Sequence, residues 1–193
     1  MQVIAGSAKG RRLVSPSHSK GARIRPLSHQ AKEALFNILA NVVGDSTFLD
    51  LFAGSGQVGI EALSRGAKIS IFIESDKGAI STIRKNLDLC GFSDRAEVYA
   101  VDAKRAVQIL DKKAASFDII FIGAPYGHKI LSEVIELIAN SCIIKQNGYI
   151  IAEHSKRQEV AEAAGKLVKF RANNYGDTVF SFYKVGTVAE EKN

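Results

Sequence analysis

"FLDLFAGSGQVG", residues 48–59, places three glycines between an apolar run and a helical pattern. An apolar run that ends in Gly54-x-Gly56-x-x-Gly59 and leads into a helix predicts a strand, a tight loop and a helix of an α/β domain. Glycines permit the tight turn and let backbone N–H groups approach a ligand closely. The spacing alone is compatible with a dinucleotide site and does not decide the ligand.

Strand and helix patterns alternate on both sides of this stretch. Predicted strands cover residues 47–52, 68–75, 96–101, 117–122, 148–154, 166–174 and 178–185, and predicted helices cover 58–66, 77–91, 103–113, 129–140 and 156–165. This alternation predicts a doubly wound, Rossmann-like α/β fold with a seven-stranded, mostly parallel sheet. Because no helix separates the last two strands, the last strand should be antiparallel, which is not the usual nicotinamide-binding topology.

The first 27 residues differ in composition from the rest of the chain. They are rich in Gly, Ser, Lys and Arg, with short apolar pieces, and predict a small β-hairpin followed by an extended loop. Ser28 then has the position of an N-cap before a helical pattern. We therefore divide the chain into a basic N-terminal arm (1–27), a main domain (28–186) and a polar tail (187–193).

Positive charge is concentrated in this N-terminal part. The chain of 193 residues has a formal net charge of +6, and between Met1 and Asn41 its only acid is Glu33. The basic residues of this segment are Lys9, Arg11, Arg12, Lys20, Arg23, Arg25 and Lys32. Clustered positive charge is typical of a surface that binds nucleic acid, although a solvated basic arm is the alternative.

The cysteines and the N-terminus bear on location. Cys90 and Cys142 lie far apart among apolar neighbours, which predicts reduced core thiols. The first residues, "MQVIAGSAKGRR", lack the apolar run of a signal peptide, and no segment has the apolar length of a membrane span. We expect a cytoplasmic monomer that binds neither a membrane nor a metal.

Acidic side chains stand at the ends of three successive predicted strands: Asp50, Glu74 and Asp102. Since the carboxyl ends of parallel strands meet at one edge of a sheet, these acids should surround one crevice. A carboxylate suits ribose hydroxyls, an amine or an adenine amino group, and it does not suit a pyrophosphate. The ligand that this set describes is S-adenosylmethionine. A helix N-cap or a surface charge is the alternative for each acid taken singly.

At this point the sequence resembles a known family. The glycine stretch with Glu74 and Asp102-Ala103 is similar to the class I methyltransferases that use S-adenosylmethionine. More closely, the chain resembles the bacterial methyltransferases that modify guanine N2 in 16S ribosomal RNA, over nearly its whole length. The segments that carry this resemblance are "IAGSAKGRRL", "RPLSHQAKEALFNIL", "LDLFAGSGQVGIEALSRGA" and "NYGDTVFSFY".

The resemblance implies a role for each matching residue. Asp50, Gly54 and Gly56 would hold the methionine end of the cofactor, Glu74 the ribose hydroxyls, and Asp102 with the N–H of Ala103 the adenine. Phe52 and Ser75 would complete the cofactor site. The partner would be 16S rRNA or the assembled small ribosomal subunit. The residues expected to contact its phosphates are Lys9, Arg11, Arg12, Arg23 and Arg25.

The stretch "FDIIFIGAPYGH", residues 117–128, holds the expected catalytic loop. In amino-methyltransferases this loop normally reads Asp-Pro-Pro-Tyr or Asn-Pro-Pro-Tyr; here it reads Gly123, Ala124, Pro125 and Tyr126. The Ala124 carbonyl can still accept an N–H of the substrate amine, and the Tyr126 ring can stack on a flipped-out base. The side-chain acceptor is missing at Gly123, and loss of one such partner costs on the order of hundreds-fold in rate.

Three interpretations of this loop remain open. The enzyme is active but slow, or is completed when its substrate orders the loop. Alternatively another group, Glu153 or His154 at the next strand end, supplies the acceptor, although a simple strand-end charge also explains Glu153. Finally, the chain binds RNA and cofactor without transferring a methyl group. A nicotinamide-dependent oxidoreductase is the remaining class, and Asp50, Asp102 and the basic arm argue against it.

Overall fold

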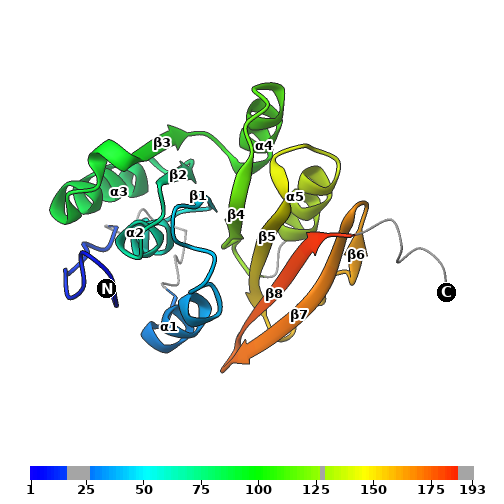
Figure 1. The fold of residues 1–193 in the computed structure, drawn as a ribbon, viewed down its shortest axis with the longest axis horizontal. Helices are drawn as coiled ribbons and strands as arrows, with labels where there is room; N and C mark the ends of the chain where they lie inside the picture. Colours follow the sequence, from blue (N-terminus) through cyan, green and yellow to red (C-terminus); the bar gives the residue numbers. More distant parts are fainter. Residues whose placement is uncertain (17–26, 127–128, 187–193) are drawn as a thin grey trace.

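The computed structural model describes residues 1–16, 27–126 and 129–186, in which an eight-stranded sheet is flanked by helices (Figure 1). The strands are β1 (Thr47–Leu51), β2 (Ile69–Glu74), β3 (Ala96–Ala100), β4 (Phe117–Ile122), β5 (Ile144–Ser155), β6 (Ala163–Ala164), β7 (Leu167–Tyr175) and β8 (Thr178–Val185). The helices are α1 (His29–Ile38), α2 (Gln57–Ser64), α3 (Lys77–Cys90), α4 (Ala103–Lys112) and α5 (Ile130–Ala139), with a short 3-10 turn at Ser93–Arg95.

The strand order is β3-β2-β1-β4-β5-β8-β7-β6. The strands from β1 to β5 are parallel, and β8 is antiparallel to both of its neighbours, β5 and β7. The predicted doubly wound, mostly parallel sheet with an antiparallel last strand is therefore confirmed. The described sheet has one strand more than the predicted seven, because the two residues of β6 pair with the start of β7.

The helices form two layers on the sheet. On one face, Phe48 of β1 packs in a cluster with Leu35 of α1, and Phe72 of β2 packs in another with Ile83 of α3. On the opposite face, Leu49 belongs to a core cluster with residues of α4 and α5. Successive strand residues point to opposite faces, so both faces of the central strands are apolar and buried.

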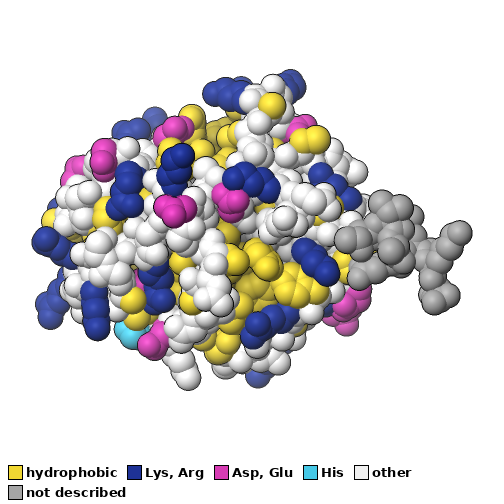
Figure 2. Space-filling model, in the orientation of Figure 1, with side chains coloured by type: hydrophobic (Ala, Val, Ile, Leu, Met, Phe, Trp, Pro, Cys, Tyr) yellow, Lys and Arg dark blue, Asp and Glu magenta, His cyan; other side chains and the backbone are white. Residues whose placement is uncertain are grey.

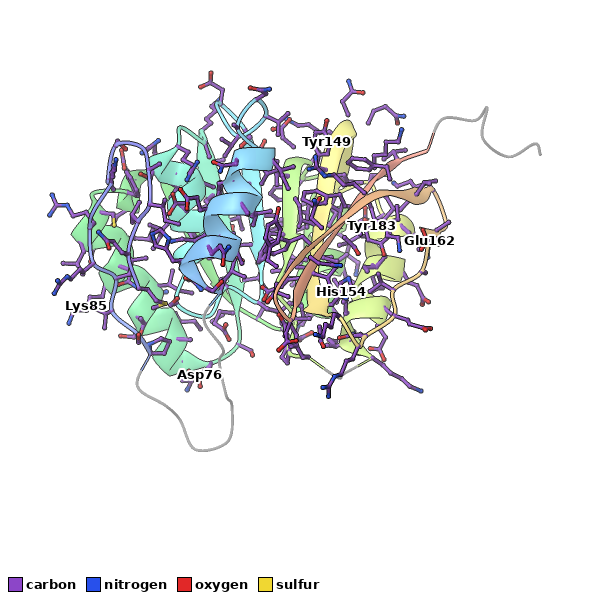
Figure 3. The ribbon with its side chains drawn as sticks, turned by 90° about the horizontal axis from the view of Figure 1, so that it is seen from below. Asp76, Lys85, Tyr149, His154, Glu162 and Tyr183 are labelled. Atoms are coloured by element: carbon purple, nitrogen blue, oxygen red, sulfur yellow. The ribbon has the colours of Figure 1, made fainter. Side chains whose placement is uncertain are left out.

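The helix predicted over residues 156–165 is wrong. This segment is mostly exposed and contains turns, an irregular stretch and the short β6, with no helix. Its backbone carbonyls have partners outside the segment: Tyr183 Oη donates to Ala161 O (2.8 Å), and the Lys169 N–H donates to Glu162 O (2.7 Å), near the labelled Tyr183 and Glu162 in Figure 3. Since Val160 is its one large aliphatic residue, the segment has no apolar stripe to bury as a helix.

Residues 1–14 double back on themselves and pack on the domain. Gln2 and Arg12 form an antiparallel bridge, and Val3, Ala8 and Leu13 are buried in a cluster with residues of α2 and α3. Gly6 has a φ of +83°, and a Cβ there would lie 1.8 Å from Ser64 O, so this turn touches the backbone of α2 directly. The expected hairpin is thus a compact loop held against α2 and α3.

The start of α1 follows the prediction. Ser28 caps the helix, and its hydroxyl accepts a hydrogen bond from the Ala31 N–H.

The expectation of two core thiols is wrong for Cys142, which is exposed; Cys90 is half-buried, and burial raises its pKa. Of the helices in the described residues, none combines the length and the apolar character needed to cross a bilayer.

Part of the sheet face beyond α1 is open to solvent. Figure 2 shows apolar side chains gathered on one side of the molecule, flanked by Lys and Arg. On β7, Phe170 is 43% exposed, and its ring lies 5.9 Å from that of Tyr149 and 6.3 Å from that of Phe182, centroid to centroid. Arg171 and Lys184 lie over this aromatic group.

Candidate cofactor and substrate site

The glycine loop between β1 and α2 has the backbone conformation that its sequence requires. Phe52, Gly54 and Gly56 have φ values of +66°, +57° and +77°, in the left-handed region that glycine tolerates best. Gly56 occupies the N-cap position of α2, where a glycine provides no side-chain cap. The loop turns sharply between β1 and α2, and its N–H groups have partners within the protein: Gly54 donates to Glu74 Oε2 (2.8 Å) and Gly56 donates to Ala53 O (2.7 Å).

Gly59 has a different reason to be glycine. A Cβ there would lie 2.4 Å from Cε1 of Phe72, so the residue permits close packing of α2 on β2. Its N–H donates a hydrogen bond to Asp50 Oδ2 at 3.0 Å. Gly59 therefore allows α2 to pack closely on β2 and holds the carboxylate of Asp50.

Asp50 is fully buried at the end of β1. Burial raises the pKa of its carboxyl from 3.8 to about 7; the Gly59 N–H opposes this shift, and the neighbouring carboxylates of Glu74 and Glu153 add to it. A buried acid among other acids is a favourable partner for a cation, because a nearby positive charge would stabilise its ionised form.

Glu74 ties the end of β2 to the glycine loop. Its Oε2 accepts a hydrogen bond from the Gly54 N–H at 2.8 Å, and its Oε1 accepts from the N–H groups of Ser75 (2.8 Å) and Asp76 (2.9 Å). A carboxylate oxygen can accept more than one hydrogen bond, so Oε2 can still receive a hydroxyl group from a ligand. Asp50 and Glu74 are therefore brought together beside the loop.

Asp102 lies further out. It is exposed and caps α4, with Oδ1 accepting from the Arg105 N–H at 3.0 Å, while the next residue, Ala103, is buried. Asp102 also lines an open groove between α4 and α5, together with Glu133 of α5. Asp102 is therefore a helix N-cap, as the alternative interpretation of this acid expected. No group of acidic, His and Cys side chains in the described residues is arranged to hold a metal ion.

The expected catalytic loop begins where β4 ends. The Gly123 N–H donates to Leu51 O at 3.2 Å, which fixes the loop beside β1, and Ala124 is buried while Pro125 is exposed. The hydroxyl of Tyr126 donates to Glu153 Oε1 at 2.9 Å and lies 3.2 Å from Thr178 Oγ1. The loop, the end of β5 and the start of β8 therefore meet at one place.

The two residues considered as substitute acceptors point to opposite faces of β5. His154 is buried, with Nε2 2.9 Å from Ser181 Oγ and Nδ1 3.0 Å from Ser155 O, and burial lowers its pKa; Figure 3 shows it beside β8. Glu153 points to the other face, where it contacts Tyr126. This difference could have been predicted from sequence. Side chains alternate along a strand, so Glu153 shares a face with Ile151 and His154 lies on the opposite face.

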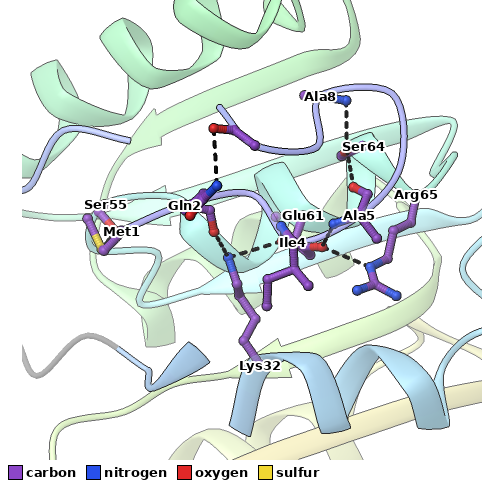
Figure 4. Close-up of polar contacts among 12 residues, drawn as sticks. Met1, Gln2, Ile4, Ala5, Ala8, Lys32, Ser55, Glu61, Ser64 and Arg65 are labelled. Atoms are coloured by element: carbon purple, nitrogen blue, oxygen red, sulfur yellow. Dashed lines mark hydrogen bonds and ion pairs between the residues drawn. The ribbon is translucent and has the colours of Figure 1, made fainter. Parts of the chain in front are cut away.

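The basic arm is divided by the structure. Lys9, Arg11 and Arg12 are exposed, whereas Arg23 and Arg25 lie outside the described residues, as do Lys20 and the tail. Lys32 does not belong to a basic surface: it is 2% exposed, and its Nζ lies 3.0 Å from Glu61 Oε2 (Figure 4). Counting charges along the sequence could not distinguish this buried ion pair from a surface cation.

Asn86 of α3 makes hydrogen bonds that could not be predicted from the sequence. Its Oδ1 accepts from the Val14 N–H (2.7 Å), and its Nδ2 donates to Val14 O (3.0 Å) and to Ser55 O (2.9 Å). One buried amide thus links the N-terminal arm to the glycine loop.

Comparison with known proteins places this geometry in a family. A family model described as "Conserved hypothetical protein 95" matches residues 1–184. The chain is 39% identical over 184 residues to YlbH of Bacillus subtilis, covering 95% of this chain and 98% of that protein. It is 30% identical over 184 residues to the Ribosomal RNA small subunit methyltransferase D of Escherichia coli, covering 95% and 89%.

A solved structure agrees. The structure of yhhF from Escherichia coli superposes with a TM-score of 0.82 and 28% identity, over 96% of this chain and 97% of that one. The chain therefore belongs to the Conserved hypothetical protein 95 family and is related to the ribosomal RNA small subunit methyltransferases D.

Proposed function

We propose that the protein transfers a methyl group from S-adenosylmethionine to the exocyclic N2 amine of a guanine in 16S ribosomal RNA. The observation that carries this proposal is the pair of buried and half-buried carboxylates, Asp50 and Glu74, bonded to the N–H groups of the glycine loop in a chain of this family. A pyrophosphate would be repelled by these carboxylates, and the sheet order places an antiparallel strand beside β5. Both features disfavour a nicotinamide cofactor.

The residues present fit S-adenosylmethionine. Asp50, desolvated beside Glu74, suits the cationic methionine end, together with the backbone of Gly54 and Gly56. Glu74 Oε2 is assigned to a ribose hydroxyl, and Phe52 and Ser75, which directly follow β1 and β2, are assigned to the same cofactor site. Asp102 and the N–H of Ala103 are assigned to the adenine. The cofactor, when bound, supplies an electrophilic methyl group on a sulfonium.

The substrate side is assigned to the loop and to the arm. Tyr126 stacks on the flipped-out guanine, and the carbonyl of Ala124 accepts one N–H of its amine, with Gly123 and Pro125 shaping the loop. Residues 1–27 form the RNA-binding arm on a methyltransferase domain of residues 28–186. The phosphate-contacting residues are Lys9, Arg11, Arg12, Arg23 and Arg25.

Two measurements test the proposal. Calorimetry should detect S-adenosylmethionine and S-adenosylhomocysteine binding and no NADH binding; a ligand at a hundredfold its dissociation constant would also stabilise the fold by about 2.7 kcal/mol. Methyl-labelled cofactor is then incubated with small subunits lacking the modification, or with naked 16S RNA, and the nucleosides are identified by mass spectrometry. Label in N2-methylguanosine supports the proposal, and label elsewhere or none contradicts it. Cofactor binding without transfer would indicate a catalytically impaired binding protein.

A further inference from the structure

The carboxylate of Glu153 stands beside the position where Gly123 lacks a side chain. Ile122 of β4 pairs with Ala152 of β5, so Gly123 and Glu153, each one residue further, lie at the same level of the sheet. A Cβ built on Gly123 would lie 3.6 Å from Glu153 Oε2. An oxygen of an aspartate or asparagine at position 123 would therefore reach the neighbourhood that Oε2 already occupies.

Glu153 shares its face of the sheet with Asp50. Phe48 and Phe121 belong to one core cluster with Ile151, on the α1 face, and the side chain of Glu153 follows Ile151 by two residues. Asp50 is likewise two residues after Phe48. Glu153 is close enough to raise the pKa of Asp50, so the two carboxylates lie toward the same crevice.

The orientation of Glu153 is fixed by its neighbours. Oε1 accepts the hydrogen bond from the Tyr126 hydroxyl, which itself lies 3.2 Å from Thr178 Oγ1. Tyr126 therefore connects the carboxylate of Glu153 to the catalytic loop and, through its own contact with Thr178, to the start of β8. Oε2 is the oxygen nearest to the missing side chain of Gly123.

We propose that Glu153 is a catalytic residue that replaces the missing side-chain acceptor of the Gly123 loop. The inference rests on the proposed function. Glu153 Oε2 and the carbonyl oxygen of Ala124 would receive the two N–H groups of the guanine amine. The nitrogen lone pair forms the new N–C bond as the methyl C–S bond breaks; the bonding pair goes to sulfur, which becomes a neutral thioether. The methylated nitrogen then releases one proton to the Glu153 carboxylate, which passes it to water.

This assignment explains how a loop without its usual acid can be competent. The acceptor has moved from the loop to the adjacent strand, where it reaches nearly the same place. Strand β5 is a rigid element in the middle of the sheet, so the acceptor is preorganised. His154 cannot take this role because it points to the opposite face and is engaged by Ser181.

The test removes the proposed acceptor at position 153 and introduces a carboxylate at position 123 instead. Glu153→Ala should reduce the rate of methyl transfer by roughly a hundredfold to a thousandfold, whereas Gly123→Asp combined with Glu153→Ala should recover at least tenfold of that loss. The matched control is Gly123→Ala with Glu153→Ala, which adds the Cβ without an oxygen and should recover nothing. Calorimetry with S-adenosylhomocysteine and thermal unfolding verify that each variant is folded and binds cofactor.

Tyr126→Phe distinguishes a direct role from an indirect one, because it keeps the ring and removes the hydroxyl bonded to Glu153. Equal transfer by Glu153→Ala and the natural protein would overturn the inference. So would a defect in Glu153→Ala that Gly123→Asp does not restore and that Tyr126→Phe reproduces in full, which would make Glu153 a positioning residue only. Absence of transfer by the natural protein overturns the proposed function and the inference with it, whereas transfer that is unaffected by Glu153→Ala overturns the inference alone.

Discussion

The ammonium nitrogen of Lys32 lies 3.0 Å from Oε2 of Glu61, and both side chains are withdrawn from solvent. Glu61 Oε2 also accepts the Ile4 N–H (2.9 Å), and Oε1 accepts the Ala5 N–H (3.0 Å) and Arg65 Nε (2.9 Å) (Figure 4). Helix α1, helix α2 and the N-terminal arm therefore meet at one carboxylate. Burial lowers the pKa of Lys32; burial also acts to raise that of Glu61, but its cationic and N–H partners leave the latter below its usual value.

Removing one member of this pair should destabilise the protein strongly. In Lys32→Met, Glu61 stays buried without its main counter-charge, and we expect the free energy of unfolding to fall by about 3–5 kcal/mol. Urea unfolding measures the change. Lys104→Met, which breaks an ion pair with Glu133 whose partners are about half exposed, is the control and should cost less than about 1 kcal/mol. Equal effects at the two sites would contradict this prediction.

Gly59→Ala should damage the fold without any ligand being present. The added Cβ would lie 2.4 Å from the Phe72 ring, and overpacking of this kind costs about 1–3 kcal/mol. Gly44→Ala is the matched control, because nothing lies within 4 Å of its added Cβ. Thermal unfolding should show a lower midpoint for Gly59→Ala and little change for Gly44→Ala. Unchanged stability of Gly59→Ala, with loss of cofactor binding alone, would instead assign Gly59 to ligand contact.

The stability of the ligand-free protein should depend on the ionisation of Asp50. Because its pKa in the folded state is about 7, against 3.8 ordinarily, the folded protein binds the extra proton between these values. The free energy of unfolding therefore falls as pH rises from about 4 to about 7, by up to roughly 1.4 kcal/mol per pH unit, and this contribution is constant above pH 7. Asp50→Asn should flatten the slope in urea titrations. A slope that persists unchanged in Asp50→Asn would contradict this prediction.

These sites show which parts of the molecule are predictable from sequence. Strands β1 to β5 and the glycine loop follow from local patterns, since apolar periodicity and turn residues act over a few positions. The helix predicted over 156–165 failed because its helix-forming residues have no apolar face, and tertiary hydrogen bonds from Tyr183 and Lys169 decide its path. The Lys32–Glu61 pair joins residues that are 29 positions apart in the numbering, and no local pattern indicates such a contact.

The position of Glu153 could be predicted from the sequence only in part. Its place at a strand end is visible in the sequence, and alternation along the strand gives its face. Its distance from Gly123 depends on the register between β4 and β5, which includes an irregularity between Phe117 and Ile119. Register of parallel strands is set by packing of both faces, so it could be read only from the structure.

The exposed cations of the N-terminal arm should determine how strongly RNA binding depends on salt. Lys9, Arg11 and Arg12 are exposed on a loop that packs against α2 and α3 through its apolar side chains, so alanine at these three positions leaves that packing intact. If each contacts one phosphate, the triple variant should bind 16S RNA more weakly, and the slope of log K against log salt should decrease by about 2.

The control for this prediction removes the same charge elsewhere. Alanine at Lys104, Lys112 and Lys113, exposed at α4 on the opposite face of the sheet, should leave the slope nearly unchanged. Filter binding between low and high salt measures both variants, and S-adenosylhomocysteine binding should be equal in the two. A similar decrease in both slopes would mean that net charge alone governs RNA binding. A decrease confined to the arm variant would place the phosphate contacts on the same face of the sheet as α1, Gly123 and Glu153, where the proposed guanine substrate would enter.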